Sequence, residues 1–184
     1  MSYDPATKIH ELSAFGEFGG VNPSITDSST YTFLKSETMK ELFESEIEGC
    51  FLYSRHWNPS NKYLSDAISA LENSESSQIT ASGISAIACS ILQICKQGDE
   101  LISSRTIYGG TYALFKNILP RFGITVKFVD VTDLATVKSS ISDNTKLIYC
   151  ESISNPLLDI SDLPALSELA HTHNMKLVVD NTFS

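Results

Sequence analysis

The stretch Lys176–Ser184, with the sequence KLVVDNTFS, decides the fold expected for this chain. Leu177, Val178 and Val179 form a short apolar run without a polar face, which predicts a parallel strand covered by helices on both sides. Asp180 stands at the carboxyl end of that strand, where open α/β sheets bind their ligands. A buried carboxylate needs a cationic partner, because an unpaired charge costs several kcal/mol. We expect that partner to be a protein cation or a protonated ligand nitrogen.

Strand and helix patterns alternate upstream of this stretch, from residue 63 onward. Strands are expected at residues 78–81, 100–103, 124–128 and 147–150, and helices at 64–71, 84–97, 110–120, 134–141 and 162–173. Alternation of this kind predicts an α/β domain, here residues 63–184, with a mostly parallel sheet and helices on both faces.

Residues 1–62 differ from this domain, because they are rich in Ser, Thr, Gly and Pro and show little periodicity. Apart from a short helix around residues 37–46, we expect an extended arm, a kind of segment that is usually functional or wrapped around something. Within the arm, Tyr53 and Arg55 combine a hydroxyl with a guanidinium, which can grip a phosphate. The alternative is a surface turn in which Arg55 packs on Trp57.

Composition and charge limit the classes of function. The net charge of −9 argues against nucleic acid or an anionic membrane surface as the main partner. No stretch is long enough to span a membrane, and the first residues lack a signal-peptide pattern, so we expect a cytoplasmic protein. The four cysteines show no CxxC spacing and are expected to be buried thiols, and no metal site is expected.

Four segments at expected strand ends or helix starts carry groups that could face a ligand. Ser82-Gly83-Ile84 opens a helix whose first N–H groups favour an anion. Tyr108 precedes two glycines and could stack on a planar ring, or could be a core tyrosine. Glu151 and Asn155 follow the next strand, although turn formation explains Asn155-Pro156 nearly as well. With Asp180, these groups describe a site for a flat, phosphorylated heteroaromatic such as pyridoxal phosphate.

Five motifs carry a resemblance to a known family. The runs YSRHWNP (53–59), SGISAI (82–87), YGGTY (108–112), ESISNP (151–156) and VVDNTF (178–183) resemble, in order and spacing, the trans-sulfuration family of pyridoxal-phosphate enzymes. Their details look most like a branch of the methionine γ-lyases, with O-acetylhomoserine sulfhydrylases and cystathionine γ-synthases as close competitors. The resemblance implies the aminotransferase-like fold type I large domain and pyridoxal 5′-phosphate as cofactor.

The resemblance also implies which groups hold the two ends of that cofactor. Backbone N–H groups of Gly83 and Ile84, with Ser82 beside them, would bind the phosphate. Asp180 would pair with the protonated ring nitrogen, and Thr182 would lie near the ring. A protonated ring is the electron sink that such enzymes need.

Further roles follow from the same resemblance. Tyr108 would stack on the ring and move protons at the substrate γ-carbon, and Asn155 would donate to the ring hydroxyl with support from Glu151. Tyr53 and Arg55 would reach the phosphate of a neighbouring subunit. The implied assembly is a homodimer or homotetramer with shared active sites.

The activity implied is γ-elimination of L-methionine to methanethiol, 2-oxobutanoate and ammonia, with γ-replacement on the same scaffold as the alternative. Two departures from the family pattern stand out. Gly110 occupies a position where many methionine γ-lyases carry a cysteine, and none of the lysines lies in the Ser-x-Thr-Lys context of the family's Schiff-base lysine. The sequence therefore resembles the amino-terminal portion of such an enzyme, and a non-catalytic interaction module is a further alternative.

Overall fold

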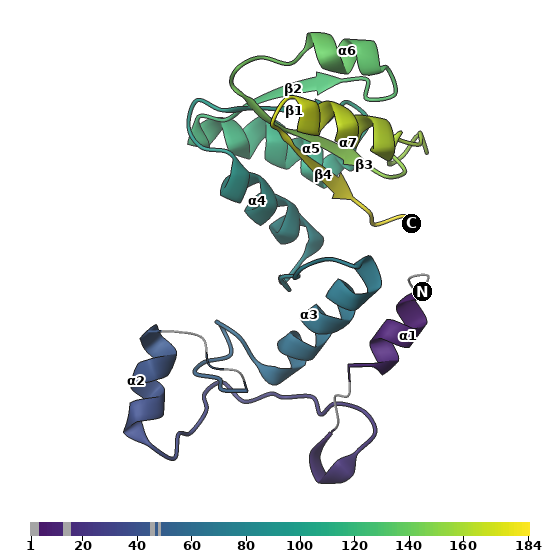
Figure 1. Cartoon of the computed structure of the whole chain (residues 1–184). Coiled ribbons are helices and arrows are strands. Elements are labelled where there is room, and N and C mark those ends of the chain that lie inside the picture. The colour runs from purple at the N-terminus through teal and green to yellow at the C-terminus, as the bar shows by residue number, and fades with distance from the viewer. Residues whose placement is uncertain (1–3, 13–15, 45–46, 48) are drawn as a thin grey trace. The chain divides into compact units, whose positions relative to one another are not determined.

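A computed structural model describes residues 4–12, 16–44, 47 and 49–184 of the 184-residue chain. Contacts group the chain into two units, Met1–Ile79 and Thr80–Ser184, which are described separately (Figure 1). The first unit extends beyond the predicted arm of residues 1–62. Contact of that arm with a neighbouring subunit stays a prediction. Within the described ranges, no helix is long and apolar enough to cross a membrane.

The first unit consists of short helices joined by irregular segments. It contains α1 (Pro5–His10), the 3₁₀ turn η1 (Glu17–Gly19), α2 (Ser36–Glu44) and α3 (Pro59–Glu72). Helix α2 confirms the helix expected at residues 37–46, of which 45 and 46 lie outside the described ranges. Helix α3 begins where the Asn58 side chain accepts a hydrogen bond of 2.8 Å from the N–H of Asn61, and it ends at Asn73 in the left-handed region.

The second unit is built on a four-stranded parallel sheet in the order β2–β1–β3–β4, which confirms the expected α/β class. The strands are β1 (Glu100–Ser104), β2 (Thr125–Val129), β3 (Thr145–Glu151) and β4 (Lys176–Asp180). Because the strands are parallel, their carboxyl ends meet at one edge of the sheet. At that edge, Glu151 at the end of β3 is the register partner of Asp180 at the end of β4.

Helices cover both faces of the sheet, and β3 supplies side chains to both cores in alternation. On one face, Tyr149 of β3 is buried in a cluster with side chains of α4 (Gly83–Ile94) and of the segment after Tyr108. On the other face, Ile148 is buried in a cluster with side chains of α6 (Leu134–Ser139) and α7 (Leu163–Thr172). Burying one large aliphatic side chain stabilises a fold by about 1.5–3 kcal/mol, so the two clusters hold the sheet between its helices.

Strand β4 is the edge strand that carries Asp180. Val178 packs against the first cluster, while Leu177 and Val179 pack against the second, so both faces of the strand are covered as predicted. The outer edge of β4 has no partner strand among the described residues. As a result, its apolar residues and Asp180 are only half-buried, whereas the sequence predicts that they are fully buried.

Three expectations from the sequence are wrong. Residues 78–81 form no strand, because neither edge strand of the described sheet pairs with them. The helix expected over 110–120 is divided into α5 (Gly109–Ala113), a π-helical turn (Leu114–Ile118) and a 3₁₀ turn (Leu119–Phe122). Pro120 accounts for the division, since it lacks an N–H and its ring clashes with the preceding helical turn. Finally, of the four cysteines expected to be buried, Cys89 is exposed on α4 and Cys50 is only half-buried, whereas burial raises the pKa of Cys95 and of Cys150 to about 11.

Candidate functional site

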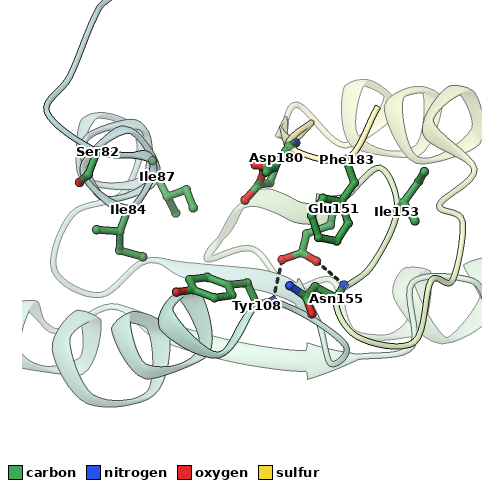
Figure 2. A pocket seen from close by; sticks show the side chains of 11 residues that line it. Ser82, Ile84, Ile87, Tyr108, Glu151, Ile153, Asn155, Asp180 and Phe183 are labelled. Atoms are coloured by element: carbon green, nitrogen blue, oxygen red, sulfur yellow. Dashed lines mark hydrogen bonds between the residues drawn. The ribbon is translucent and has the colours of Figure 1, made fainter.

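A pocket of about 460 Å³ opens at the carboxyl edge of the sheet, wholly within the second unit (Figure 2). It brings together every predicted site residue of that unit. Apolar side chains that the sequence reasoning did not single out complete its walls. The residues lining it are Ser82, Gly83, Ile84, Ile87, Tyr108, Glu151, Ile153, Asn155, Asp180, Thr182 and Phe183.

The start of α4 forms one wall of the pocket. Ser82 caps this helix, because its Oγ accepts a hydrogen bond of 3.2 Å from the N–H of Ser85. The N–H groups of Gly83 and Ile84 lie in the first turn, which intrahelical hydrogen bonds do not reach. The helix dipole adds partial positive charge at the same place. This wall is therefore suited to an anionic group of a ligand.

Glu151 joins two of the loops that border the pocket. Its Oε1 accepts a hydrogen bond of 2.7 Å from the N–H of Tyr108, and its Oε2 accepts one of 2.8 Å from the N–H of Asn155 (Figure 2). The side chain is 5% exposed, and such burial is stable only because both oxygens have hydrogen-bond donors. Glu151 thus fixes the backbone of both loops, and the supporting role expected for it at the cofactor stays a prediction.

The loop from Ser152 to Ser161 holds Asn155 at the pocket by closing on itself. The N–H of Ser154 donates to the carbonyl of Asp159 at 2.9 Å, and Ile153 forms a bridge with Ile160. The Ser161 hydroxyl donates to the carbonyl of Glu151 at 2.8 Å. Asn155 is therefore positioned by its loop, and its side-chain amide lies at the pocket (Figure 2).

The ring of Tyr108 borders the pocket opposite Asp180 and is 53% exposed (Figure 2). This exposure excludes the alternative that Tyr108 is a core tyrosine. Gly110 allows the ring to lie where it does, because a Cβ on residue 110 would stand 2.5 Å from a ring carbon of Tyr108. An aromatic ring with an exposed face and a hydroxyl can both stack on a planar ligand and exchange protons with it.

Asp180 presents its carboxylate to the pocket, with hydrogen-bond donors on both oxygens. Oδ1 accepts from the N–H of Thr182 at 3.1 Å and from the Thr182 hydroxyl. Oδ2 accepts a hydrogen bond of 3.2 Å from the hydroxyl of Tyr149. Within the described ranges, no lysine, arginine or histidine forms an ion pair with Asp180. A cationic ligand atom as the partner of this carboxylate stays a prediction.

Tyr149 was missed by sequence reasoning. It lies two residues before Glu151 on β3, and strand alternation places the two side chains on the same face of the sheet. Burial, together with the nearby charge of Asp180, raises the pKa of Tyr149 well above its ordinary value. Strand alternation could have shown that Tyr149 lies on the same face as Glu151. Its contact with Asp180 could not be predicted in this way, because it depends on the register between β3 and β4.

Tyr53 and Arg55 belong to the first unit, whereas all the residues that line the pocket belong to the second. The guanidinium of exposed Arg55 lies over the ring of Tyr53, with 4.8 Å between its carbon and the ring centroid. Arg55 therefore stacks on Tyr53 and not on Trp57, the alternative considered above. Tyr53 itself is fixed by a β-bridge to Thr30.

The fold and the site define a class of protein, namely α/β proteins with a pocket suited to an anionic ligand at the carboxyl edge of a parallel sheet. The sequence profile of the family "Cys/Met metabolism PLP-dependent enzyme" matches residues 6–184. The chain belongs to this family, which confirms the resemblance to the trans-sulfuration enzymes, and the cofactor of the family is pyridoxal 5′-phosphate.

Similar proteins include enzymes with different reactions. A methionine γ-lyase of Arabidopsis thaliana is 42% identical over 98% of this chain and 42% of its own length. An O-succinylhomoserine sulfhydrylase of Pseudomonas aeruginosa is 38% identical over 91% of this chain and 41% of its own. The crystal structure of a cystathionine γ-lyase from Lactobacillus plantarum in complex with L-serine superposes with a TM-score of 0.85, at 33% identity, over 100% of this chain and 45% of the other. The chain thus spans less than half the length of these proteins.

Proposed function

We propose that the protein containing this chain is a pyridoxal-phosphate carbon–sulfur lyase that converts L-methionine and water to methanethiol, 2-oxobutanoate and ammonia. The observation that carries the proposal is the convergence of a helix start, an aromatic ring, an amide and a carboxylate on one pocket. Support for the substrate comes from the Arabidopsis relative, a methionine γ-lyase.

The residues of the pocket fit the cofactor group by group. The N–H groups at the start of α4 would bind the phosphate, Tyr108 would stack on the ring, and Asn155 would donate to the ring hydroxyl. Asp180 would face the ring nitrogen. Two opposite charges about 4 Å apart attract by roughly 4 kcal/mol at an effective dielectric constant of about 20. That attraction corresponds to about three pK units, which keeps a ring nitrogen protonated at neutral pH.

When bound, the cofactor withdraws electrons from the substrate's Cα and so makes the neighbouring protons acidic. The chain then supplies proton transfer at the other end of the substrate. The hydroxyl of Tyr108 would give its proton to the sulfur of methionine as the Cγ–S bond breaks, so that methanethiol leaves as a neutral thiol. The apolar side chains of Ile84, Ile87 and Phe183 at the pocket would keep water from the reacting atoms.

A γ-replacement reaction is the second candidate, and two observations favour it. Gly110 leaves the position beside Tyr108 without a side chain, where many methionine γ-lyases carry a cysteine. In addition, the Pseudomonas relative is a sulfhydrylase. Such an enzyme adds a thiol to the substrate after the leaving group has departed, whereas in the lyase reaction water releases 2-oxobutanoate and ammonia. The two reactions therefore differ in whether a second substrate can enter the site.

One experiment separates the two reactions. The full-length protein is supplied with methionine alone in one reaction, and with an O-acyl homoserine plus sulfide in another. Release of 2-oxobutanoate from methionine supports the lyase. Formation of homocysteine in the second reaction, with methionine inert, supports the sulfhydrylase. Absence of both products, from protein that carries the cofactor, would contradict both proposals.

We also propose that two copies of the chain complete each other's sites through the arm. Apolar side chains of the first unit are unusually exposed, among them Phe18 at 104%, Ile25 at 93% and Leu34 at 105%. Exposed apolar groups of this kind mark contact surfaces. Among the described residues, no carboxylate pairs with Arg55, so its charge is available to an anion. The phosphate bound by a neighbouring chain is the anion we propose for it.

A further inference from the structure

Tyr149 holds the Asp180 carboxylate from inside the core. Its side chain is fully buried on β3, and its hydroxyl donates to Asp180 Oδ2 over 3.2 Å. This hydrogen bond and those from Thr182 approach different oxygens of the carboxylate. The carboxylate is therefore held at both oxygens, and its orientation at the pocket is set by two separate elements of the chain.

The ring of Tyr149 is fixed by packing. Phe115 meets it edge to face, with 4.9 Å between the ring centroids and 80° between the planes. Leu147 on the same strand and Val178 on the neighbouring strand belong to the same cluster. Close-packed side chains of this kind occupy one rotamer, so packing fixes the position of the hydroxyl.

Thr111 is fully buried in α5, the helix that begins directly after Tyr108. Its Oγ1 has no hydrogen bond of ordinary geometry, which is true of no other buried side-chain nitrogen or oxygen in the described ranges. Thr111 lowers the pKa of Tyr149, and the larger effect of burial raises it.

The hydroxyl of Tyr149 thus donates from the core to the carboxylate at the pocket. We propose that Tyr149 is a positioning residue that fixes the Asp180 carboxylate toward the ring nitrogen of bound pyridoxal phosphate. The inference rests on the proposed function, and it adds a residue outside the pocket lining to the groups that determine how the ring nitrogen is held. Because burial keeps the Tyr149 hydroxyl protonated, it remains a donor at alkaline pH as well.

The test measures recognition of a single ligand atom by binding and not by turnover. Dissociation constants of the full-length protein are determined by equilibrium dialysis for pyridoxal phosphate and for an analogue in which C–H replaces the ring nitrogen. The unmodified protein should prefer pyridoxal phosphate, because only this ligand pairs with Asp180. Tyr149→Phe keeps the ring and removes only the hydroxyl, and we expect it to reduce that preference about tenfold, as for a lost hydrogen bond to a charged group.

A control variant makes the outcome specific. Tyr112→Phe removes the hydroxyl of a different tyrosine, on α5, which accepts a hydrogen bond from Lys116 and does not line the pocket, and it should leave the preference unchanged. If Tyr149→Phe weakens both ligands equally or weakens neither, Tyr149 is only structural and the inference is wrong. If the unmodified protein binds neither ligand, the proposed function itself fails.

Discussion

The carboxylates of Glu151 and Asp180 are register partners at the ends of two neighbouring parallel strands and lie on the same face of the sheet. They differ in what surrounds them. Glu151 receives two backbone N–H groups and is buried, whereas Asp180 receives side-chain donors and a backbone N–H and stays half-buried beside the pocket. The two carboxylates therefore have different parts in the structure, since Glu151 joins two loops and Asp180 presents its carboxylate to the pocket.

Removing the charge of Asp180 tests this relationship. Asp180→Asn keeps an oxygen that can accept from Tyr149 but removes the attraction for a protonated ring nitrogen. A loss of about three pK units of that attraction predicts a fall in turnover of about 10³-fold. Release of 2-oxobutanoate from methionine by the full-length variant measures the effect, and thermal unfolding checks that the fold is intact. Near-normal turnover would remove Asp180 from the site.

Tyr108 is tested as the proton donor to the leaving sulfur. Tyr108→Phe retains the stacking ring and should slow release of 2-oxobutanoate by about 10²- to 10⁴-fold, the usual contribution of a general acid or base. Tyr112→Phe is the matched control, because its hydroxyl meets Lys116 on the same segment. Equal rates for Tyr108→Phe and Tyr112→Phe would show that the hydroxyl of Tyr108 moves no proton in the slow step.

The absence of a side chain at Gly110 should matter for the position of the Tyr108 ring. In Gly110→Ala the new Cβ would stand 2.5 Å from that ring, which must therefore move. Because the ring is half-exposed and free to turn outward, we expect little loss of stability and a fall in turnover of about tenfold or more. In the neighbouring control, Gly109→Ala, the added Cβ would meet no atom within 4 Å. A Gly110→Ala variant as active as this control would contradict the link between residue 110 and the ring.

Much of the fold was predictable because the apolar runs of β1, β2 and β3 and the stripe of α4 are strong local signals. The same holds for pocket residues such as Asp180 and Asn155, since parallel strands bring their carboxyl ends to one edge. The role of Tyr149 was not predictable, because its contact with Asp180 depends on the register between β3 and β4. Equally, nothing local to residues 78–81 shows whether a partner strand is available to them.

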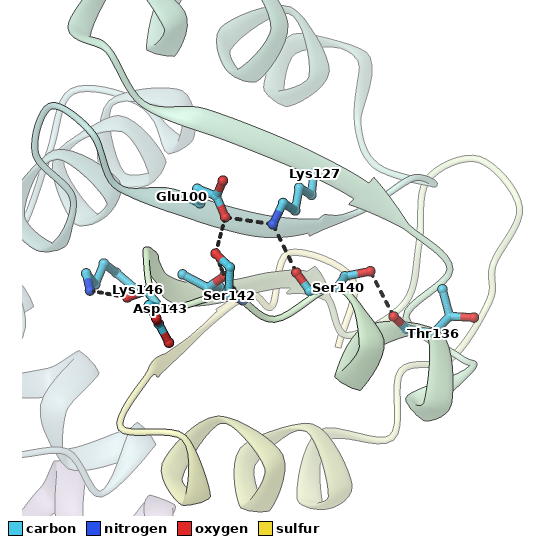
Figure 3. Close-up of polar contacts among 8 residues, drawn as sticks. Glu100, Lys127, Thr136, Ser140, Ser142, Asp143 and Lys146 are labelled. Atoms are coloured by element: carbon cyan, nitrogen blue, oxygen red, sulfur yellow. Dashed lines mark hydrogen bonds and ion pairs between the residues drawn. The ribbon is translucent and has the colours of Figure 1, made fainter.

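The ion pair at the opposite edge of the sheet predicts a dependence of stability on pH. Lys127 Nζ lies 2.7 Å from Glu100 Oε2, and Ser142 donates to the same oxygen (Figure 3). Hydrogen bonds from Lys127 and Ser142 hold the pKa of Glu100 below its ordinary value of 4.5. A carboxylate whose pKa is lowered by folding stabilises the native state above the unfolded value, and this contribution is lost as the pH falls through the folded value.

Lys127→Met should therefore destabilise the protein at pH 7, and the difference from the unmodified protein should shrink as the pH falls below 4.5. Urea unfolding at a series of pH values measures this difference in the free energy of unfolding. Lys176→Met serves as the control, since no carboxylate in the described ranges pairs with Lys176, and its effect should not vary with pH in this range. A difference for Lys127→Met that stays constant with pH would show that the pair with Glu100 contributes nothing.

Sharing of sites between two chains is tested by mixing two inactive variants. Arg55→Ala removes a group of the first unit, and Asp180→Ala removes a group of the pocket in the second. If the arm serves the neighbouring chain in a two-fold symmetric dimer, a mixed dimer has one site with both lesions and one site with neither. Random pairing makes half of the dimers mixed, so about one site in four of the whole population should be active, and about one in two once the mixed dimers are isolated. If Arg55 serves its own chain, every site keeps one lesion, and mixing restores nothing.

The full-length variants are co-expressed with different affinity tags and purified through both, so that mixed oligomers are isolated before 2-oxobutanoate is measured. Inactive mixed oligomers would refute the shared site even if the protein is a dimer.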